Sequence, residues 1–181
     1  TGMEDARYFT AHYPAPDLSI VPDTGFPVCC AQRGSMTLSV EVPFAHEVTI
    51  RQSNNPSVTP EEITAVLADG TALTSKGDSA HIFKADGIDN AIVKLLKLLG
   101  ERFLEDAEKL NDVAGLINSW HGETLGIDYA DELSGALQMG AIAMAWEDGK
   151  LKVRVFIILP VSADADEMTS RANCITQQFV I

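Results

Sequence analysis

The polar cluster with the clearest chemical potential spans residues 120–124, where a histidine and a carboxylate flank a glycine. Histidine titrates near neutral pH, so His121 beside Glu123 would form a general acid/base pair if both side chains entered a cleft. A simpler interpretation makes the segment a connector between helices, with Trp120 in the core and His121 near the negative end of a helix dipole. We favour the connector and keep the acid/base pair as the alternative.

A second candidate for chemistry is Ser79, which ends a Gly-Asp-Ser triplet two residues before His81. Nucleophilic catalysis would require a base within about 3 Å of the hydroxyl and a third group that orients that base. It would also require a rigid strand-to-helix turn and an oxyanion hole, whereas the sequence around Ser79 indicates a loop before a short strand over 80–85. We therefore do not assign Ser79 as a nucleophile.

The four histidines and three cysteines do not have the spacing of a metal site. Neither C-x-x-C nor H-E-x-x-H occurs, and His46-Glu47 is followed by Ile50 where a second histidine would be needed. Cys29 and Cys30 are expected to be a buried apolar pair. Glycine-rich phosphate-binding motifs are also lacking in the sequence. We expect no metal and no cofactor.

Charge limits the kinds of partner. The 181 residues carry 26 acidic and 13 basic side chains, a formal charge of −13 that disfavours generic binding to nucleic acids. Nine of the acidic residues fall within 101–132, a concentration typical of a solvated helical surface that would also suit docking to a basic protein. Within this acidic concentration, we expect the partner-binding surface to comprise Glu101, Glu105, Asp106 and Glu108.

The strongest structural pattern lies at 139–160, where Asp148-Gly149 separates two runs rich in apolar residues. This dipeptide is typical of a type I′ turn, so the segment is predicted to be a two-residue β-hairpin with Glu147 opposite Lys150 and Ile142 opposite Val155. One face is then apolar. It comprises Ile142, Met144, Trp146, Leu151, Val153 and Val155.

The opposite face of this predicted hairpin alternates alanines with long basic side chains. Lys150, Lys152 and Arg154 would lie across a low floor of alanine at 141, 143 and 145. A solvated face is the simpler interpretation, and a platform for an anion or a partner protein is the alternative.

The remaining elements follow from periodicity and turn residues. Segments 36–42 and 47–52 alternate like strands and are expected to pair as a second hairpin. A short helix is expected from Thr59, with a capping box closed by Glu62, to Gly70, followed by a loop over 71–78. Asp86 is expected to cap a long amphipathic helix over 88–110. Further helices are predicted over 111–120 and 129–137, and an edge strand over 173–181.

These elements predict an α+β fold: a mainly antiparallel sheet built from hairpins, with a long amphipathic helix and shorter helices packed on one face. Residues 36–181 form a single domain in this interpretation. Residues 1–35, which contain four prolines, form an irregular N-terminal arm packed on it. No apolar run is long enough to span a bilayer. The odd cysteine number, without disulfide-framework spacing, favours a cytoplasmic protein.

The function expected from the sequence is a soluble acidic protein-interaction module without catalytic activity, of the inhibitor/immunity, chaperone or assembly-subunit type. Its partner would be another protein, bound through the acidic residues or through Lys150, Lys152 and Arg154. The edge strand over 173–181 would also allow homo-oligomerisation. The alternative is a small-molecule-binding protein or small enzyme with a pocket between sheet and helices, using His121 and Glu123.

Overall fold

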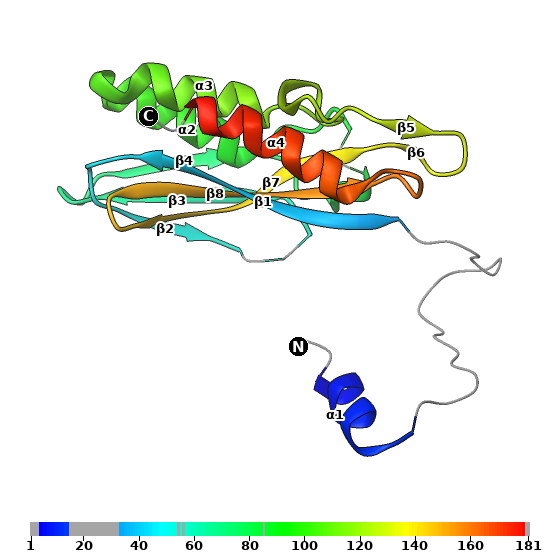
Figure 1. Ribbon diagram of the computed structural model, residues 1–181. Coiled ribbons are helices and arrows are strands. Elements are labelled where there is room, and N and C mark those ends of the chain that lie inside the picture. Colours follow the sequence, from blue (N-terminus) through cyan, green and yellow to red (C-terminus); the bar gives the residue numbers. More distant parts are fainter. Residues whose placement is uncertain (1–3, 15–32, 54, 56, 85, 180–181) are drawn as a thin grey trace. The chain divides into compact units, whose positions relative to one another are not determined.

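The computed structural model describes residues 4–14, 33–53, 55, 57–84 and 86–179 (Figure 1). The chain divides into two compact units, 1–32 and 33–181. In the first unit, Glu4–His12 forms helix α1, in which the Tyr8 and His12 rings stack at 4.1 Å between centroids. Most of the predicted N-terminal arm, and therefore its predicted packing, falls on residues 15–32, outside the described residues.

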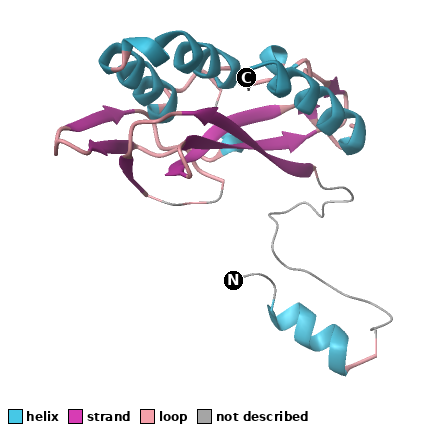
Figure 2. Cartoon of the chain, turned by 60° about the vertical axis from the view of Figure 1, so that its left-hand side comes forward, coloured by secondary structure: helices cyan, strands magenta, loops and turns pink. Residues whose placement is uncertain are grey.

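The second unit has two three-stranded antiparallel sheets, with strand orders β1-β8-β7 and β2-β3-β4. In the described residues of this unit, the three α-helices lie on the same side of the strands (Figures 1 and 2). The predicted α+β fold with antiparallel sheets built from hairpins is thus confirmed. The strands are β1 (Gly34–Pro43), β2 (Val48–Gln52), β3 (Glu62–Leu67), β4 (Ala72–Lys76), β7 (Gln138–Glu147) and β8 (Lys150–Leu159). The helices are α2 (Ala91–Arg102), α3 (Ala107–Ile117) and α4 (Ala165–Phe179).

The predicted hairpin is confirmed as β7 and β8. Asp148 and Gly149 have φ of 53° and 74°, as a type I′ turn requires. The predicted register holds from Glu147 opposite Lys150 to Ala143 opposite Arg154. Ile142 was expected opposite Val155, which is wrong, because the register shifts between Ala141 and Ala143 and places Ala141 there.

This bulge turns Ile142 away from the helix-facing core. Ile142 packs instead with Ile82 and Ile158 in a separate buried cluster. The bulge lies beside Asn90, a buried residue whose side-chain oxygen accepts a hydrogen bond from the Ile92 backbone N–H at 2.9 Å and so caps α2. The Asn90 side-chain amide donates to the Ala141 carbonyl at 2.9 Å. One residue therefore fixes both the start of α2 and the irregular point of β7.

The main core lies between the helices and the sheet face turned toward them. The residues of β8 on this face are fully buried and pack with alternate residues of β1 and with the apolar stripes of α2 and α3. Burying each such side chain contributes about 1.5–3 kcal/mol relative to leaving it in water. The β8 members of this core are Leu151, Val153, Val155 and Ile157.

The long helix predicted over 88–110 is not confirmed. It is divided into α2 and α3 by Phe103, at φ −119° and ψ 84°, and by a short 3-10 turn, η2 (Leu104–Asp106). The Phe103 ring stacks on His46 at 4.0 Å between centroids. The apolar periodicity that predicted a straight helix does not reveal this aromatic contact. Gly100 lies close to the start of α3, where a Cβ on it would be in van der Waals contact with Ala107 Cα, at 3.4 Å. Asp86 precedes the helix instead of capping it.

The helix predicted over 59–70 is wrong, because these residues form the strand β3 and its flanks. Ile63, Ala65 and Leu67 are buried in strict alternation, which is the period of a strand. The expected cap, Thr59, is fully buried, and its hydroxyl donates to the Asp78 carbonyl at 2.7 Å. The loop expected over 71–78 contains strand β4, which pairs with β3.

Several further expectations are corrected by the pairing pattern. The strands at 36–42 and 47–52 exist, but β1 pairs with β8 and β2 pairs with β3. The helix expected over 129–137 is a small ribbon of β5 (Ala130–Asp131) and β6 (Gly135–Ala136). The short strand expected over 80–85 is a single bridge at His81 followed by a 3-10 turn, η1 (Ile82–Lys84).

The edge strand predicted over 173–181 is not formed in the described residues. These residues belong to helix α4 as far as Phe179, so the expected edge for homo-oligomerisation is not formed there. Met168 and Ala172 of α4 are buried in the main core.

Within the described residues, no helix combines the length and the apolar character needed to cross a membrane.

Candidate functional site

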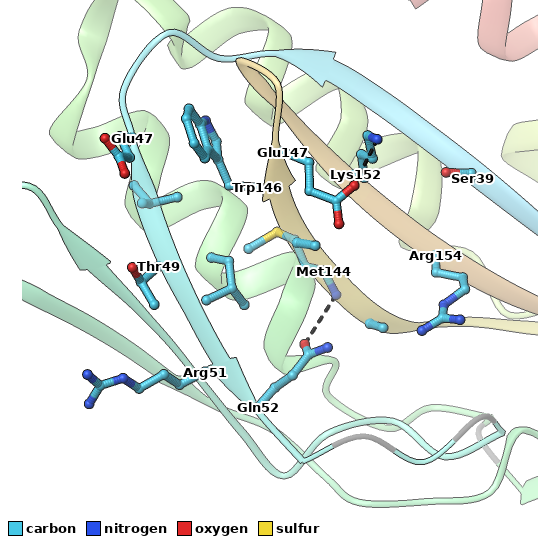
Figure 3. A pocket seen from close by; sticks show the side chains of 14 residues that line it. Ser39, Glu47, Thr49, Arg51, Gln52, Met144, Trp146, Glu147, Lys152 and Arg154 are labelled. Carbon is cyan, nitrogen blue, oxygen red and sulfur yellow. Dashed lines mark hydrogen bonds and ion pairs between the residues drawn. The ribbon is translucent and has the colours of Figure 1, made fainter.

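A groove lies between β2 and β7, each of which ends its own sheet. Its volume is about 920 Å³, near the upper end of the usual range of ligand pockets, about 300–1,000 Å³. No ladder joins β2 to β7 in the described part of the chain. Instead, the Gln52 side-chain oxygen accepts a hydrogen bond from the Met144 backbone N–H at 3.1 Å (Figure 3). The groove is therefore a place where two strand edges face each other without pairing.

The hairpin turn determines which backbone groups of β7 face this groove. Glu147 and Lys150 flank a two-residue turn and so form a hydrogen-bonded pair. In an antiparallel ladder such pairs alternate with pairs that are not hydrogen-bonded, so the N–H and C=O of Trp146 and Met144 point away from β8. The Met144 hydrogen bond to Gln52 agrees with this alternation. The outer edge of β7 thus presents main-chain donors and acceptors to the groove.

The floor of the groove includes apolar side chains from both strands. Ile50 of β2 is half-buried, and Met144 of β7 is 3% exposed. The Trp146 indole N–H donates to the Phe44 carbonyl at 3.0 Å, which fixes the orientation of this large ring. A ligand would therefore meet preformed apolar surface between two polar strand edges.

Charged side chains lie at both ends of the groove (Figure 3). Glu47 and Glu147 lie at the end near the hairpin turn, and Arg51 and Arg154 lie toward the other end. The Lys152 ammonium binds the Glu147 carboxylate at 2.9 Å, and this hydrogen bond raises the pKa of Lys152. In the described residues, Glu47, Arg51 and Arg154 have no ion-pair partner.

The three predicted basic residues of the hairpin therefore differ in their contacts. Lys150 binds Glu41 at 2.9 Å, and its hydrogen bond and charge lower the pKa of that carboxyl group. Lys152 is paired with Glu147, as described above. Arg154 is exposed between the small residues Ser39 and Ala143 on the neighbouring strands. Lys150 and Lys152 are thus held in ion pairs, whereas the guanidinium of the exposed Arg154 is accessible to a ligand.

The predicted acidic surface is divided by the fold. The Glu105 carboxylate lies 3.0 Å from the His46 ring nitrogen. Asp106 is 8% exposed and binds the Lys109 ammonium at 2.6 Å. These two carboxylates hold the turn between α2 and α3 against the segment before β2. Glu101 and Glu108 are exposed on α2 and α3.

His121 and Glu123 lie in the connector after α3, and neither lines the groove between β2 and β7. The His121 Nδ1 donates to the Leu137 carbonyl at 2.8 Å, and its Nε2 lies 3.8 Å from Asp86. The Glu123 carboxylate accepts a hydrogen bond from the Ser119 hydroxyl, which lowers the pKa of Glu123.

These contacts give both residues local structural roles. The Ser119 hydroxyl oxygen also accepts from the backbone N–H groups of Gly122 and Glu123, at 3.0 and 3.2 Å, and so holds the turn that follows α3. The segment is a connector, but it joins α3 to the β5–β6 ribbon and not to a second helix as expected. The acid/base pair stays a prediction.

The other sequence candidates do not assemble into a catalytic or metal-binding group in the described residues. Ser79 is exposed, and the nearby His81 stacks on Phe83 at 5.1 Å between ring centroids. The His81 Nδ1 accepts a hydrogen bond from the Phe83 backbone N–H. Among the described residues, no three metal-ligating side chains lie close enough together to hold a metal ion. Cys29 and Cys30 lie outside the described residues.

Sequence reasoning missed the β2 side of the groove, namely Glu47, Arg51 and Gln52. Their alternation in a strand was visible in the sequence, but β2 was expected to pair with β1, which would have placed it elsewhere. No protein-family model matches the chain, and no curated protein matches it in sequence. The site must therefore be interpreted from its geometry and chemistry alone.

Proposed function

We propose that this chain is a non-catalytic protein-interaction module that docks a segment of another protein in the groove between β2 and β7. The observation that carries the proposal is the pair of facing strand edges above an apolar floor. Exposed strand edges readily pair with other chains, and proteins normally cover or blunt them. Recognition through a strand edge supplies main-chain hydrogen bonds, while side-chain pockets supply specificity.

The charge distribution supports a protein partner. A formal charge of −13 repels nucleic acid phosphates, whereas the groove itself contains both acidic and basic side chains. Mixed charges with an apolar centre are typical of a protein-docking surface, in which charge gives orientation and buried apolar groups give affinity. The proposed module is of the inhibitor/immunity, chaperone or assembly-subunit type.

Site-specific photo-crosslinking in the native host tests this proposal. A crosslinking amino acid at Thr49, on the rim of the groove, should capture a discrete partner. The matched control is Thr74, another exposed threonine in the same sheet but on β4. Capture at Thr49 should disappear when Ala145→Trp fills the groove, with the circular dichroism spectrum unchanged. Equal capture at both positions, or capture that survives Ala145→Trp, would contradict docking in the groove.

A further inference from the structure

The Gln52 side chain occupies a position that a neighbouring strand would otherwise fill. A glutamine amide carries the same carbonyl acceptor and N–H donors as a peptide group. Its oxygen accepts from the Met144 N–H at 3.1 Å, as the carbonyl of an adjacent strand would. Two residues further along β7, Trp146 presents the next outward-facing N–H and C=O. The β7 edge thus has the geometry for strand pairing, with one side-chain amide standing in for a partner.

Charges follow a definite order along the groove. Glu47 immediately precedes β2 and Arg51 follows four positions later, a separation of about 13 Å at the rise of an extended strand. Across the groove, Glu147 and Arg154 lie at the corresponding ends (Figure 3). The groove therefore has an acidic end and a basic end. Because Glu147 is paired with Lys152, Glu47 is the carboxylate at the acidic end that has no ion pair in the described part of the chain.

We propose that the occupant of the groove is an extended segment of the partner protein that pairs with the outer edge of β7. It carries a carboxylate side chain for Arg154 and, about four residues away, a basic side chain for Glu47. Apolar side chains between these two charges cover Ile50 and Ala145. This inference rests on the proposed function and names the class of segment that the groove takes.

An extended segment fits the groove better than a helix for a physical reason. The backbone groups of a helix bond within the helix, so a docked helix would leave the Trp146 N–H and C=O without protein partners. An extended segment supplies those partners and directs every second side chain toward the floor. A carboxylate also suits Arg154 better than a doubly charged phosphate does, because the protein as a whole carries a charge of −13.

Selection from a displayed library of random 12-residue peptides on the full chain tests the charge pattern. Wild type should enrich peptides with β-branched residues and an acidic and a basic residue about four positions apart. With Arg154→Glu, the acidic position should change to a basic one, and wild-type peptides should bind at least tenfold more weakly. Lys97→Glu, an equal charge change at an exposed position of α2, should leave the selection unchanged. Failure to enrich this pattern, or the same pattern on Arg154→Glu, would overturn the inference.

Amide hydrogen exchange with an enriched peptide tests the strand pairing. Exchange of the Trp146 backbone amide should slow at least tenfold on binding, while the Ala145 amide, already in the ladder with Lys152, should change little. Unchanged exchange at Trp146 with a bound peptide would reject the extended-strand inference. A groove-dependent crosslink at Thr49 would still support docking in that case, so failure of this inference differs from failure of the proposed function.

Discussion

The two faces of the β7–β8 hairpin are made by alternate residues of the same strands, yet they meet different surroundings. On β8, Leu151, Val153 and Val155 face the helices and are completely buried. Lys152 and Arg154, between them in sequence, face the opposite side and are accessible to solvent. This difference means that one face of the hairpin is part of the core, while the other leaves polar side chains accessible, and it is on this second face that we propose binding. Substitutions on one face should therefore leave the task of the other largely unchanged.

The face turned away from the helices is itself divided by the β7 bulge. On one side of the bulge, Ile142 and Ile158 are closed off by Ile82. On the other side, Ala143 and Ala145 form the low surface beside Arg154 and Lys152. The bulge thus marks the boundary between a closed apolar cluster and the open groove.

The largest effect on stability should come from the helix-facing side. Leu151→Ala removes a completely buried side chain and should lower the free energy of unfolding by about 2–5 kcal/mol. Urea denaturation measures this change. Lys152→Ala, the adjacent residue on the other face, should lower the free energy of unfolding far less than Leu151→Ala does, because exposed ion pairs contribute little. Equal losses for the two substitutions would contradict the separation of the faces.

An intermediate effect is expected in the closed cluster beside the bulge. Ile142→Val removes one methylene group from a buried site and should cost about 0.5–1.5 kcal/mol, measured by thermal unfolding. The matched control is Ile50→Val, which removes the same group from a half-buried position in the groove and should cost less. A larger loss at Ile50 would show that the groove, and not the Ile142 cluster, is the closed part of this face.

Local patterns predicted the hairpin because its turn dipeptide and its alternation lie within one continuous segment. The predicted helix over 59–70 was wrong because a local pattern carries no information about pairing with distant strands. Thr59 and Glu62 match a capping box locally, but pairing with β2 and β4 determines the conformation of β3. The long helix failed at Phe103, whose ring contacts Phe44 and His46 far away in the sequence. Contacts of this kind are not encoded by periodicity.

The candidate site shows the same limit. His121 and Glu123 stood out because they are neighbours in sequence, whereas the groove combines Arg51 of β2 with Arg154 of β8. These two arginines line the same groove because β2 lies beside β7, and the expected β1–β2 hairpin excluded that arrangement. Arg154 was predicted as part of a basic platform, but its difference from Lys150 depends on Glu41, which the β1–β8 register places nearby.

A smaller effect is expected for the paired basic residues, and it depends on pH. Lys150 holds the pKa of Glu41 below its ordinary value, so this contact stabilises the folded state above the ordinary glutamate pKa, about 4.3. The stabilisation is lost as pH falls through the lowered pKa of the folded state. Glu41→Gln should therefore reduce stability slightly at pH 7, and the difference from wild type should shrink below about pH 4.

Urea denaturation of both proteins at pH 7 and pH 3 measures this difference. Asp112→Asn, which neutralises an exposed carboxylate on α3, is the control for the general change in net charge. A gap between wild type and Glu41→Gln that widens toward acid pH would show that Lys150 does not stabilise the ionised carboxylate. In that case the Lys150 ammonium would not be engaged by Glu41 and could contact a ligand, as we propose for the Arg154 guanidinium.

The smallest effect on stability should coincide with the largest effect on binding, at Arg154. Arg154→Met keeps an unbranched apolar side chain over Ala143 and removes only the guanidinium, so unfolding should change by no more than about 0.5 kcal/mol. Affinity for a peptide enriched on the full chain should fall at least tenfold by fluorescence anisotropy. Lys97→Met on α2 should change neither quantity. If Arg154→Met destabilised the domain as Leu151→Ala does, Arg154 would belong to the scaffold, and the exposed face of the hairpin would no longer be free for recognition.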